Sequence, residues 1–263
     1  MTSGTLPARY RSAASTSGST SPLGRWVVYG PGRYARAVRD GDCRVAVVVS
    51  PNNPTSVAVP AGDLRRLCAA VAPAVVLLDE SFVDFAAPPA GSLLPDLAEH
   101  PNLVVVKSVS KVYGVGGLRL GFSATADPAL ARWISDRLPI WNVNGLAEEF
   151  VRLLPHFRAD FHASCARVRA ETRELAGLLA ELPGVHVVPP DANFVLLRLP
   201  PGLPADRAAD ELFAARAILT KDCGGKTMPD GNRWLRVASR TAAENWAVVD
   251  GLREVLGRAT APE

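Results

Sequence analysis

Short hydrophobic runs that alternate with helical segments are the feature that most constrains the fold of this chain. Arg44–Ser50 (RVAVVVS) is a β-branched run that stops before a proline, which is typical of a buried strand and its exit loop. Ala74–Leu78, Leu103–Val106 and Leu118–Ser123 predict further strands, and Asp63–Val71 predicts a helix capped by its first residue. Strands separated by helices form βαβ units, so the pattern predicts an α/β fold with a mostly parallel sheet.

The pattern changes in the second half of the chain. Residues 127–182 are predicted to be helical and to end in a long amphipathic segment, with a linker near Pro183. The predicted elements beyond it are strands at Val185–Val188, Phe194–Leu199, Ala217–Lys221 and Trp234–Ala238, and helices near Ala205–Ala215 and Ala242–Leu256. We therefore expect a disordered tail at 1–24, a larger domain at 25–182 and a small α+β domain at 183–263.

Composition excludes several classes of protein. The chain has 263 residues, of which 48% are hydrophobic and 21% charged, so a substantial core can form. A net charge of +3, without a basic stripe, argues against a nucleic-acid-binding protein. No apolar run approaches the roughly 20 residues that span a bilayer. The four cysteines form no CxxC pair, so we expect neither a metal site nor disulfides, and a soluble, cytoplasmic protein.

The first residues differ from the rest. Ser, Thr, Gly and Ala dominate residues 1–24, and several arginines precede the first acidic residue, Asp40. An Arg- and Ser-rich, acid-poor start is typical of an organellar transit peptide, but composition alone is a weak signal. A disordered tail is the simpler interpretation of these residues.

Three motifs follow predicted strands, where polar chemistry collects in parallel sheets. They are Ser50–Thr55 (SPNNPT), Leu78–Phe82 (LDESF) and Ser108–Lys111 (SVSK), the last followed by Gly116–Gly121 (GGLRLG). The glycines do not form a dinucleotide fingerprint, because Arg119 stands where the third glycine is required.

A serine hydrolase is a poor alternative. Ser108-x-x-Lys111 matches the S-x-x-K motif of serine β-lactamases, but S-D-N is absent and the nearest match to K-T-G is Lys226-Thr227-Met228. A G-x-S-x-G nucleophile motif is also absent. Acyl transfer through Ser108 is therefore not favoured.

Taken together, in this order, the three motifs resemble those of the class I/II aminotransferases, enzymes that use pyridoxal 5'-phosphate (PLP). The resemblance covers about residues 40–256 and is nearest the branch of histidinol-phosphate aminotransferases and threonine-phosphate decarboxylases. It implies that Lys111 forms the Schiff base with PLP, that Asp79 partners the pyridine nitrogen, and that Asn53 donates to the ring hydroxyl.

The resemblance also assigns a phosphate site. It places Arg119 and the hydroxyls of Ser108 and Ser110 on the PLP phosphate. An arginine suits this role because its charge is permanent and its donors are fixed in a fork. A nearby cation also favours the neutral amine that Lys111 needs as a nucleophile, and a carboxylate at Asp79 keeps the pyridinium protonated as an electron sink.

Substrate contacts are implied in the C-terminal part. The segment LRVASR resembles the family segment whose first arginine, here Arg236, binds the substrate anion, and Lys221 stands where histidinol-phosphate aminotransferases usually have arginine. A surface ion pair is the alternative for both residues. Asn144 is a further expected substrate contact, while Trp141 either lines the pocket or belongs to the core.

Two departures from the family pattern bear on function. Phe82 stands where many members have a tyrosine, which favours the threonine-phosphate decarboxylase branch. The segment before the Asn-Pro motif is much shorter than in the family, so we expect an N-terminally truncated chain with an incomplete large domain. The missing part would hold the glycine loop that binds the phosphate.

These observations predict a PLP-dependent enzyme that transaminates an amino acid or its phosphorylated analogue through Lys111. Decarboxylation of a phosphorylated amino acid is one alternative, and a truncated, non-catalytic remnant or scaffold is another. Because family members form dimers with sites near the interface, the resemblance also implies a homodimer.

Overall fold

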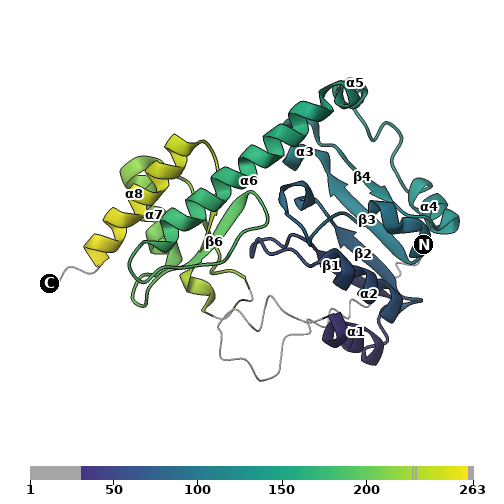
Figure 1. Ribbon diagram of the computed structural model, residues 1–263, viewed down its shortest axis with the longest axis horizontal. Coiled ribbons are helices and arrows are strands. Elements are labelled where there is room, and N and C mark those ends of the chain that lie inside the picture. The colour runs from purple at the N-terminus through teal and green to yellow at the C-terminus, as the bar shows by residue number, and fades with distance from the viewer. Residues whose placement is uncertain (1–30, 227, 229, 260–263) are drawn as a thin grey trace, which may run out of the picture.

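The computed structural model describes residues 31–226, 228 and 230–259, which form two sheets with helices packed against each (Figure 1). The first part contains α1 (Pro31–Asp40), β1 (Val45–Val49), α2 (Ala61–Val71), β2 (Val75–Asp79), η1 (Val83–Phe85), η2 (Leu94–Glu99), β3 (Leu103–Ser108), α3 (Val109–Val112), η3 (Gly116–Leu118), β4 (Gly121–Ala124), α4 (Pro128–Ser135), α5 (Gly145–Leu153) and η4 (Leu154–Phe157). The long helix α6 (Arg158–Ala180) leads to β5 (His186–Val187), β6 (Phe194–Arg198), α7 (Ala205–Arg216), β7 (Lys221–Asp222), η5 (Gly231–Arg233), β8 (Trp234–Ala238) and α8 (Ala242–Ala259).

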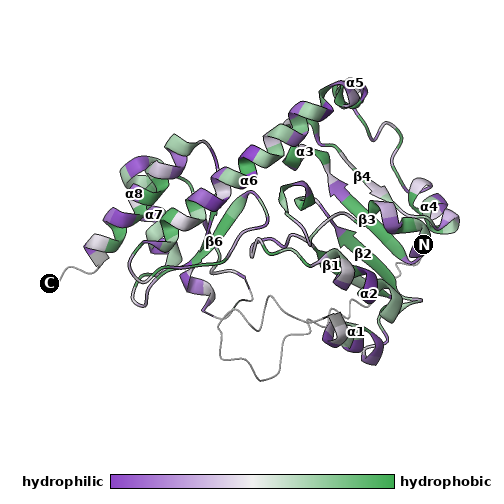
Figure 2. Cartoon of the chain, viewed as in Figure 1, coloured by the Kyte–Doolittle hydropathy of each residue, from purple (hydrophilic) through white to green (hydrophobic). Residues whose placement is uncertain are grey.

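The first sheet has the predicted mostly parallel arrangement. Its order is β1-β2-β3-β4, with β1, β2 and β3 parallel and β4 antiparallel to β3. Hydrophobic residues dominate β1, β2 and β3 (Figure 2), and those on one face pack with α1 and α2 into a core that includes Leu78 and Leu103. The register aligns Val49 with Asp79 and Asp79 with Val106, so the strand ends reach one edge together.

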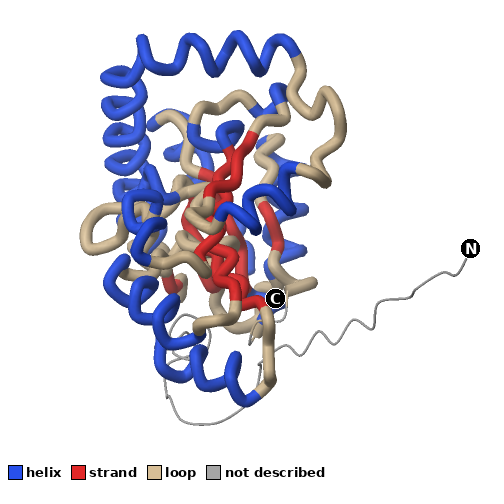
Figure 3. The backbone as a smooth tube through the Cα atoms, turned by 90° about the vertical axis from the view of Figure 1, so that its right-hand side faces the viewer, coloured by secondary structure: helices blue, strands red, loops and turns tan. Residues whose placement is uncertain are grey.

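The second sheet is antiparallel, in the order β5-β6-β8-β7. Helices α6, α7 and α8 supply the other side of its core. In Figure 3, which looks along the line from the first sheet to the second, the strands of both sheets overlap at the centre with helices around them. The prediction of Trp234–Ala238 is confirmed to the residue. The prediction of a strand at Ala217–Lys221 is displaced, because Ala217 ends α7 in a left-handed conformation (φ 54°) and β7 begins only at Lys221.

Some local predictions are wrong. Residues 127–182 are not continuously helical, since a non-helical stretch from Asp136 to Asn144 separates α4 from α5. Trp141 does not belong to the core, because it is 95% exposed there with φ at 58°. Asp63 is not the helix cap, because α2 starts two residues earlier and Asp63 pairs with Arg66.

The described residues begin with a helix that the sequence patterns did not indicate. Helix α1, which was not predicted, buries Ala35 and Val38 against the first core. The predicted tail at 1–24 lies outside the described residues. Within residues 31–226, 228 and 230–259, no helix has the length and apolar character required to cross a membrane.

Candidate active site

The parallel register brings the three sequence motifs to one edge of the first sheet. Ser50 donates its backbone N–H to the carbonyl of Asp79 (2.9 Å), and Glu80 donates to the carbonyl of Val106 (2.8 Å). The residues that follow β1, β2 and β3 therefore start from neighbouring positions, as expected for a site at the carboxyl end of a parallel sheet.

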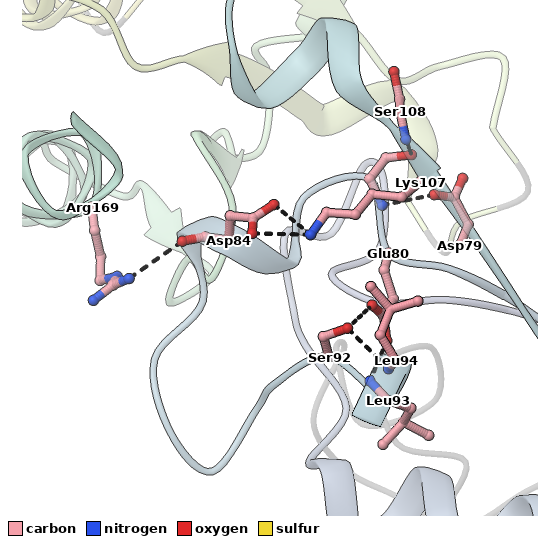
Figure 4. A network of polar contacts seen from close by, with 10 residues as sticks. Asp79, Glu80, Asp84, Ser92, Leu93, Leu94, Lys107, Ser108 and Arg169 are labelled. Carbon is pink, nitrogen blue, oxygen red and sulfur yellow. Dashed lines mark hydrogen bonds and ion pairs between the residues drawn. The ribbon is translucent and has the colours of Figure 1, made fainter. Parts of the chain in front are cut away.

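The turn after β2 holds Asp79 and ties it to β3. The backbone N–H of Ser81 donates to Oδ1 of Asp79 (2.9 Å), and the backbone N–H of Ser108 donates to the hydroxyl of Ser81 (3.1 Å) (Figure 4). Ser81 is buried, so both bonds are shielded from water. The turn engages Oδ1 of Asp79, which allows Oδ2 to accept a hydrogen bond from a ring nitrogen.

Asn53 and Arg236, which are 183 positions apart in the chain, meet at this edge. Nη1 of Arg236 donates to Oδ1 of Asn53 (2.6 Å), and its guanidinium carbon lies 5.2 Å from the centroid of the Phe194 ring. The amide oxygen of Asn53 is thereby engaged, which orients its NH2 group as a donor toward a ligand. Arg236 contacts an amide here, so this contact is not the surface ion pair that was the alternative interpretation.

Lys111 lies near the same group of residues. It is exposed on the short helix α3, and its Nζ lies 5.5 Å from the centroid of the Phe82 ring. Phe82 packs edge-to-face on Phe194, with centroids 5.2 Å apart and an interplanar angle of 85°. Two aromatic rings thus connect the Lys111 amine to the Arg236 guanidinium. Phe82 brings no hydroxyl to this position.

The residues expected to hold the phosphate are engaged within their own loop. The buried hydroxyl of Ser110 donates to the carbonyl of Leu120 (3.3 Å) and accepts from its N–H (3.2 Å). Arg119 is exposed, has a left-handed backbone (φ 55°) and donates to the carbonyl of Gly116 (3.1 Å). Ser108 lies at the junction of β3 and α3. The structure therefore groups the three expected phosphate contacts along one loop without converging their donors on a point.

The remaining expected substrate residues lie in different surroundings. Asn144 caps α5 by accepting from the N–H of Ala147 (2.9 Å), and its NH2 donates to the carbonyl of Leu118 (3.0 Å). Lys221 is exposed, lies opposite Arg236 in the β7–β8 ladder, and has its Nζ 4.0 Å from Oδ2 of Asp222. Lys221 and Arg236 both line a cavity of about 570 Å3 beside α7. The structure therefore brings Lys221, but not Asn144, next to Arg236.

A network of ion-pair and hydrogen-bond contacts beside the turn after β2 was not predicted from the sequence. Nζ of Lys107 lies 3.0 Å from Oδ1 and 2.9 Å from Oδ2 of Asp84, and Arg169 of α6 donates to the carbonyls of Asp84 (3.3 Å) and Phe85 (2.9 Å) (Figure 4). The only signal in the sequence is that Asp84 and Lys107 flank two of the motifs. The network fixes the turn to both β3 and α6.

Glu80 is a second buried acid in this turn. It is 1% exposed, and its carboxylate accepts from the hydroxyl of Ser92 and the N–H of Leu93. Burial raises the pKa of Glu80, and the nearby carboxylate of Asp84 adds to the effect, while the two hydrogen bonds and Lys107 oppose it. This acid therefore holds the 92–94 loop from a position without access to solvent.

The donor set at the sheet edge fits a pyridoxal phosphate. An exposed amine (Lys111), a carboxylate held at one oxygen (Asp79) and an amide oriented as a donor (Asn53) match an aldehyde, a pyridine nitrogen and a ring hydroxyl. The residues expected to bind the PLP phosphate match less closely. Ser110 and Arg119 hydrogen-bond to the carbonyls of Leu120 and Gly116, and these donors have to break those bonds before they can bind a phosphate.

Comparison with known proteins agrees with this assignment. A family model described as "Aminotransferase class I and II" matches residues 33–252. The CMP-5'-(3-aminopropyl)phosphonate synthase of Streptomyces rubellomurinus is 56% identical over 85% of this chain and 36% of its own length. The histidinol-phosphate aminotransferase of Oleidesulfovibrio alaskensis is 36% identical over 82% of this chain and 56% of its own. The chain thus spans about a third to just over a half of these two relatives.

Solved structures share the fold. The L-threonine-O-3-phosphate decarboxylase of Porphyromonas gingivalis superposes with a TM-score of 0.73 at 26% identity, over 81% of this chain and 64% of that one. The histidinol-phosphate aminotransferase of Sinorhizobium meliloti, solved with pyridoxal-5'-phosphate, gives 0.77 at 20% identity, over 88% and 62%. The predicted fold is confirmed, and the comparisons indicate PLP as the family's cofactor. The chain belongs to the class I and II aminotransferase family.

Proposed function

We propose that the chain is the Lys111-bearing part of a PLP-dependent enzyme that transaminates an amino compound carrying a phosphate or phosphonate group. The observation that carries the proposal is the contact between Asn53 and Arg236. This contact supports the proposal, because Asn53 can donate to the cofactor ring while Arg236 beside it can bind the substrate anion. The contact of the Lys111 amine with Phe82, in the turn after β2, supports it further.

Each residue has a role that follows from its chemistry. PLP supplies an aldehyde and an electron-accepting ring when it is bound. Lys111 forms the covalent link and later moves a proton at the substrate carbon. Asp79 stabilises a positive charge at the ring nitrogen, and Ser81 holds Asp79 in place. The ring of Phe82 covers one side of the Lys111 amine, and Phe194 holds that ring in place by packing on it.

The substrate class follows from the cations near Asn53 and from the relatives. Arg236 and Lys221 are paired across the β7–β8 ladder, and an arginine fork binds phosphate, phosphonate or carboxylate oxygens in pairs. The relatives from Streptomyces rubellomurinus, Oleidesulfovibrio alaskensis and Porphyromonas gingivalis are named after compounds that carry both an amino group and a phosphate or phosphonate group. This supports a substrate with both groups.

Decarboxylation is the second candidate reaction. Phe82 contributes only an apolar ring edge where the family pattern has a tyrosine hydroxyl, and the P. gingivalis structure is that of a decarboxylase. The substrate can lose either carbon dioxide or its Cα proton. Which one it loses depends on which of these two bonds at Cα is held perpendicular to the PLP ring by the residues that bind the substrate. We propose that Arg236 and Lys221, which lie opposite each other in the β7–β8 ladder, decide that orientation.

We further propose that the chain forms a homodimer. The loop between α4 and α5 exposes large apolar side chains, with Ile140 88% and Trp141 95% exposed, and Leu146 on α5 is 76% exposed. Several large apolar side chains exposed within one short stretch of chain support an interface with another protein.

Spectroscopy of the purified chain with added PLP tests the function. We expect a visible absorption band that borohydride fixes to the protein, with a single labelled lysine at position 111. Lys111→Ala should lose both the band and the label, whereas Lys226→Ala, which removes an exposed lysine outside the site, should keep them. A folded chain that binds no PLP would contradict the proposal and favour a remnant or scaffold.

The reaction type is tested with threonine O-3-phosphate as a probe of the right class. Transamination yields a 2-oxo acid and no carbon dioxide, while decarboxylation yields carbon dioxide and no 2-oxo acid. Detection of carbon dioxide alone would replace the first candidate reaction by the second.

A further inference from the structure

Two lysine amines approach the turn after β2 from different sides. The chain has four lysines, Lys107, Lys111, Lys221 and Lys226. Lys107 and Lys111 lie at the end of β3 and on the helix that follows it. Nζ of Lys111 faces the ring of Phe82 (5.5 Å), and Nζ of Lys107 faces the carboxylate of Asp84, two residues further along the same turn. The two amines therefore lie against residues that are two positions apart in the same turn.

The two amines differ in their surroundings. Lys111 is exposed, whereas the side chain of Lys107 is 13% exposed and that of Asp84 is 21% exposed. Nζ of Lys107 donates to Oδ1 of Asp84 (3.0 Å), and Oδ2 lies 2.9 Å from it in ion-pair contact without hydrogen-bond geometry. A partly buried ammonium held in this way has no lone pair to offer a carbonyl carbon.

The rest of the turn preserves this pairing. Arg169 is bonded to the backbone carbonyls of Asp84 and Phe85, so in this arrangement it does not take the carboxylate from Lys107. Glu80, the other acid near Lys107, is bonded to Ser92 and Leu93. The remaining titratable groups facing Asp84 are Tyr113 and Cys165; burial, followed by the carboxylate of Asp84, raises the pKa of both, for Cys165 to about 11. Both are therefore uncharged at neutral pH.

We infer that Asp84 makes cofactor attachment selective for Lys111 by holding Lys107 as its ion-pair partner. The inference rests on the proposed function. Attachment requires a neutral amine, because its lone pair adds to the aldehyde carbon, a C=N bond forms, and the aldehyde oxygen leaves as water. Without Asp84, the Lys107 amine loses the carboxylate that engages it, which leaves a second amine available four residues from the first.

Competitive acetylation of the chain without cofactor tests the ion pair directly. With a limiting amount of an acetylating reagent at neutral pH, we expect Lys107 in the folded chain to react at least about tenfold more slowly than Lys111, and at a similar rate in urea. Asp84→Asn, which keeps the shape of the side chain, should raise the rate at Lys107 about tenfold. Asp96→Asn is the matched control, because it removes an ion pair with Arg65 (2.9 Å) outside the site.

Two outcomes would overturn the inference. One is equal labelling of Lys107 and Lys111 in the folded wild-type chain. The other is an Asp84→Asn chain that is folded by near-UV circular dichroism and still protects Lys107.

Trapping of PLP with borohydride then tests selectivity. Peptide mapping should find the label on Lys111 in the wild type and on both Lys107 and Lys111 in Asp84→Asn. Lys107→Arg keeps a cation for Asp84 and removes the competing amine, so its label should remain on Lys111. Label confined to Lys111 in Asp84→Asn would contradict the inference. A wild-type chain that traps no PLP would contradict the proposed function, whereas the acetylation rates would still decide the role of Asp84.

Discussion

At the residue scale, two acids behind the sheet edge, one buried and one half-buried, hold the turn that carries the proposed ligand contacts. Asp84 pairs with Lys107, and Glu80 holds the 92–94 loop through Ser92 and Leu93. Neither acid was assigned a role from the sequence, yet both lie in the turn that carries Asp79 and Phe82. A carboxylate without solvent costs stability unless its hydrogen bonds and partners offset its desolvation. The pKa of Glu80 is raised, so the offset is incomplete there.

Glu80→Gln is therefore expected to stabilise the chain at neutral pH. Because the pKa of Glu80 is higher in the folded than in the unfolded chain, its favourable contribution is fully present below about pH 4.5 and is lost as pH rises through the folded pKa. Gln is uncharged at every pH and can still accept from Leu93 and donate to the hydroxyl of Ser92. Urea unfolding from pH 4 to 7.5 should show a stability gain at pH 7 that shrinks toward pH 4. A variant that is less stable than the wild type at pH 7 would show that the ionised carboxylate is favourable.

At the element scale, the strands that were predicted correctly are those formed by a continuous hydrophobic run of several residues. Strands β1, β2, β3, β6 and β8 were predicted within one or two residues, because each is a short, continuous run of mostly apolar residues. The expectation of a buried strand is wrong for β1, because Val45 and Val47 are 51% and 53% exposed. Strand β7 has two residues, and its position depends on where α7 ends, which local pattern does not encode. The break at 136–144 was missed because its apolar residues continue the helical composition around it.

The same reasoning explains which parts of the site were predictable. The motifs at Asn53, Asp79 and Lys111 follow predicted parallel strands, so their common edge follows from topology. The contact between Asn53 and Arg236 depends on how the second sheet docks on the first, and the ion pair of Lys107 with Asp84 depends on the path of a turn. Neither is encoded in a local pattern.

Asn144 provides a prediction for one element, because its side chain contacts the backbone at both ends. Asn144→Ala removes the cap of α5 and the bond to Leu118, and it should lower the free energy of unfolding by about 1 to 2 kcal/mol. Asn144→Asp keeps the cap but cannot donate to Leu118, so it should be destabilised less at neutral pH. Urea unfolding of the three chains checks this order. Wild-type stability for Asn144→Ala would instead favour the earlier expectation of a substrate contact.

At the scale of the whole molecule, the two sheets are joined by α6 and by contacts that converge on the candidate site. A small apolar cluster at this junction includes Phe82 and Phe85 from the first part, Cys165 from α6, and Ala192 and Phe194 from the second. Arg169 adds hydrogen bonds from α6 to η1. The residues that link the parts thus also carry or flank the proposed ligand contacts, so docking of the parts and assembly of the site are coupled.

The exposed loop between α4 and α5 determines the expected assembly. Ile140 and Trp141 are 88% and 95% exposed, and covering them with a second copy removes this apolar surface from water. Sedimentation velocity of the wild-type chain at micromolar concentration should show a dimer. Ile140→Ser combined with Trp141→Ser should shift it to a monomer that keeps the wild-type circular dichroism spectrum.

Trp246→Ser is the control for this experiment, because Trp246 on α8 is also exposed (44%) but lies on the second part of the chain. This variant should remain dimeric. A wild-type monomer, or a double variant that still dimerises, would contradict the assignment of this loop as the interface. Because the loop is anchored by Asn144 to Leu118, next to Arg119, dimerisation through it would also bring the partner close to the expected phosphate loop. The double variant should then bind PLP more weakly than the wild type, which titration of the visible band can measure.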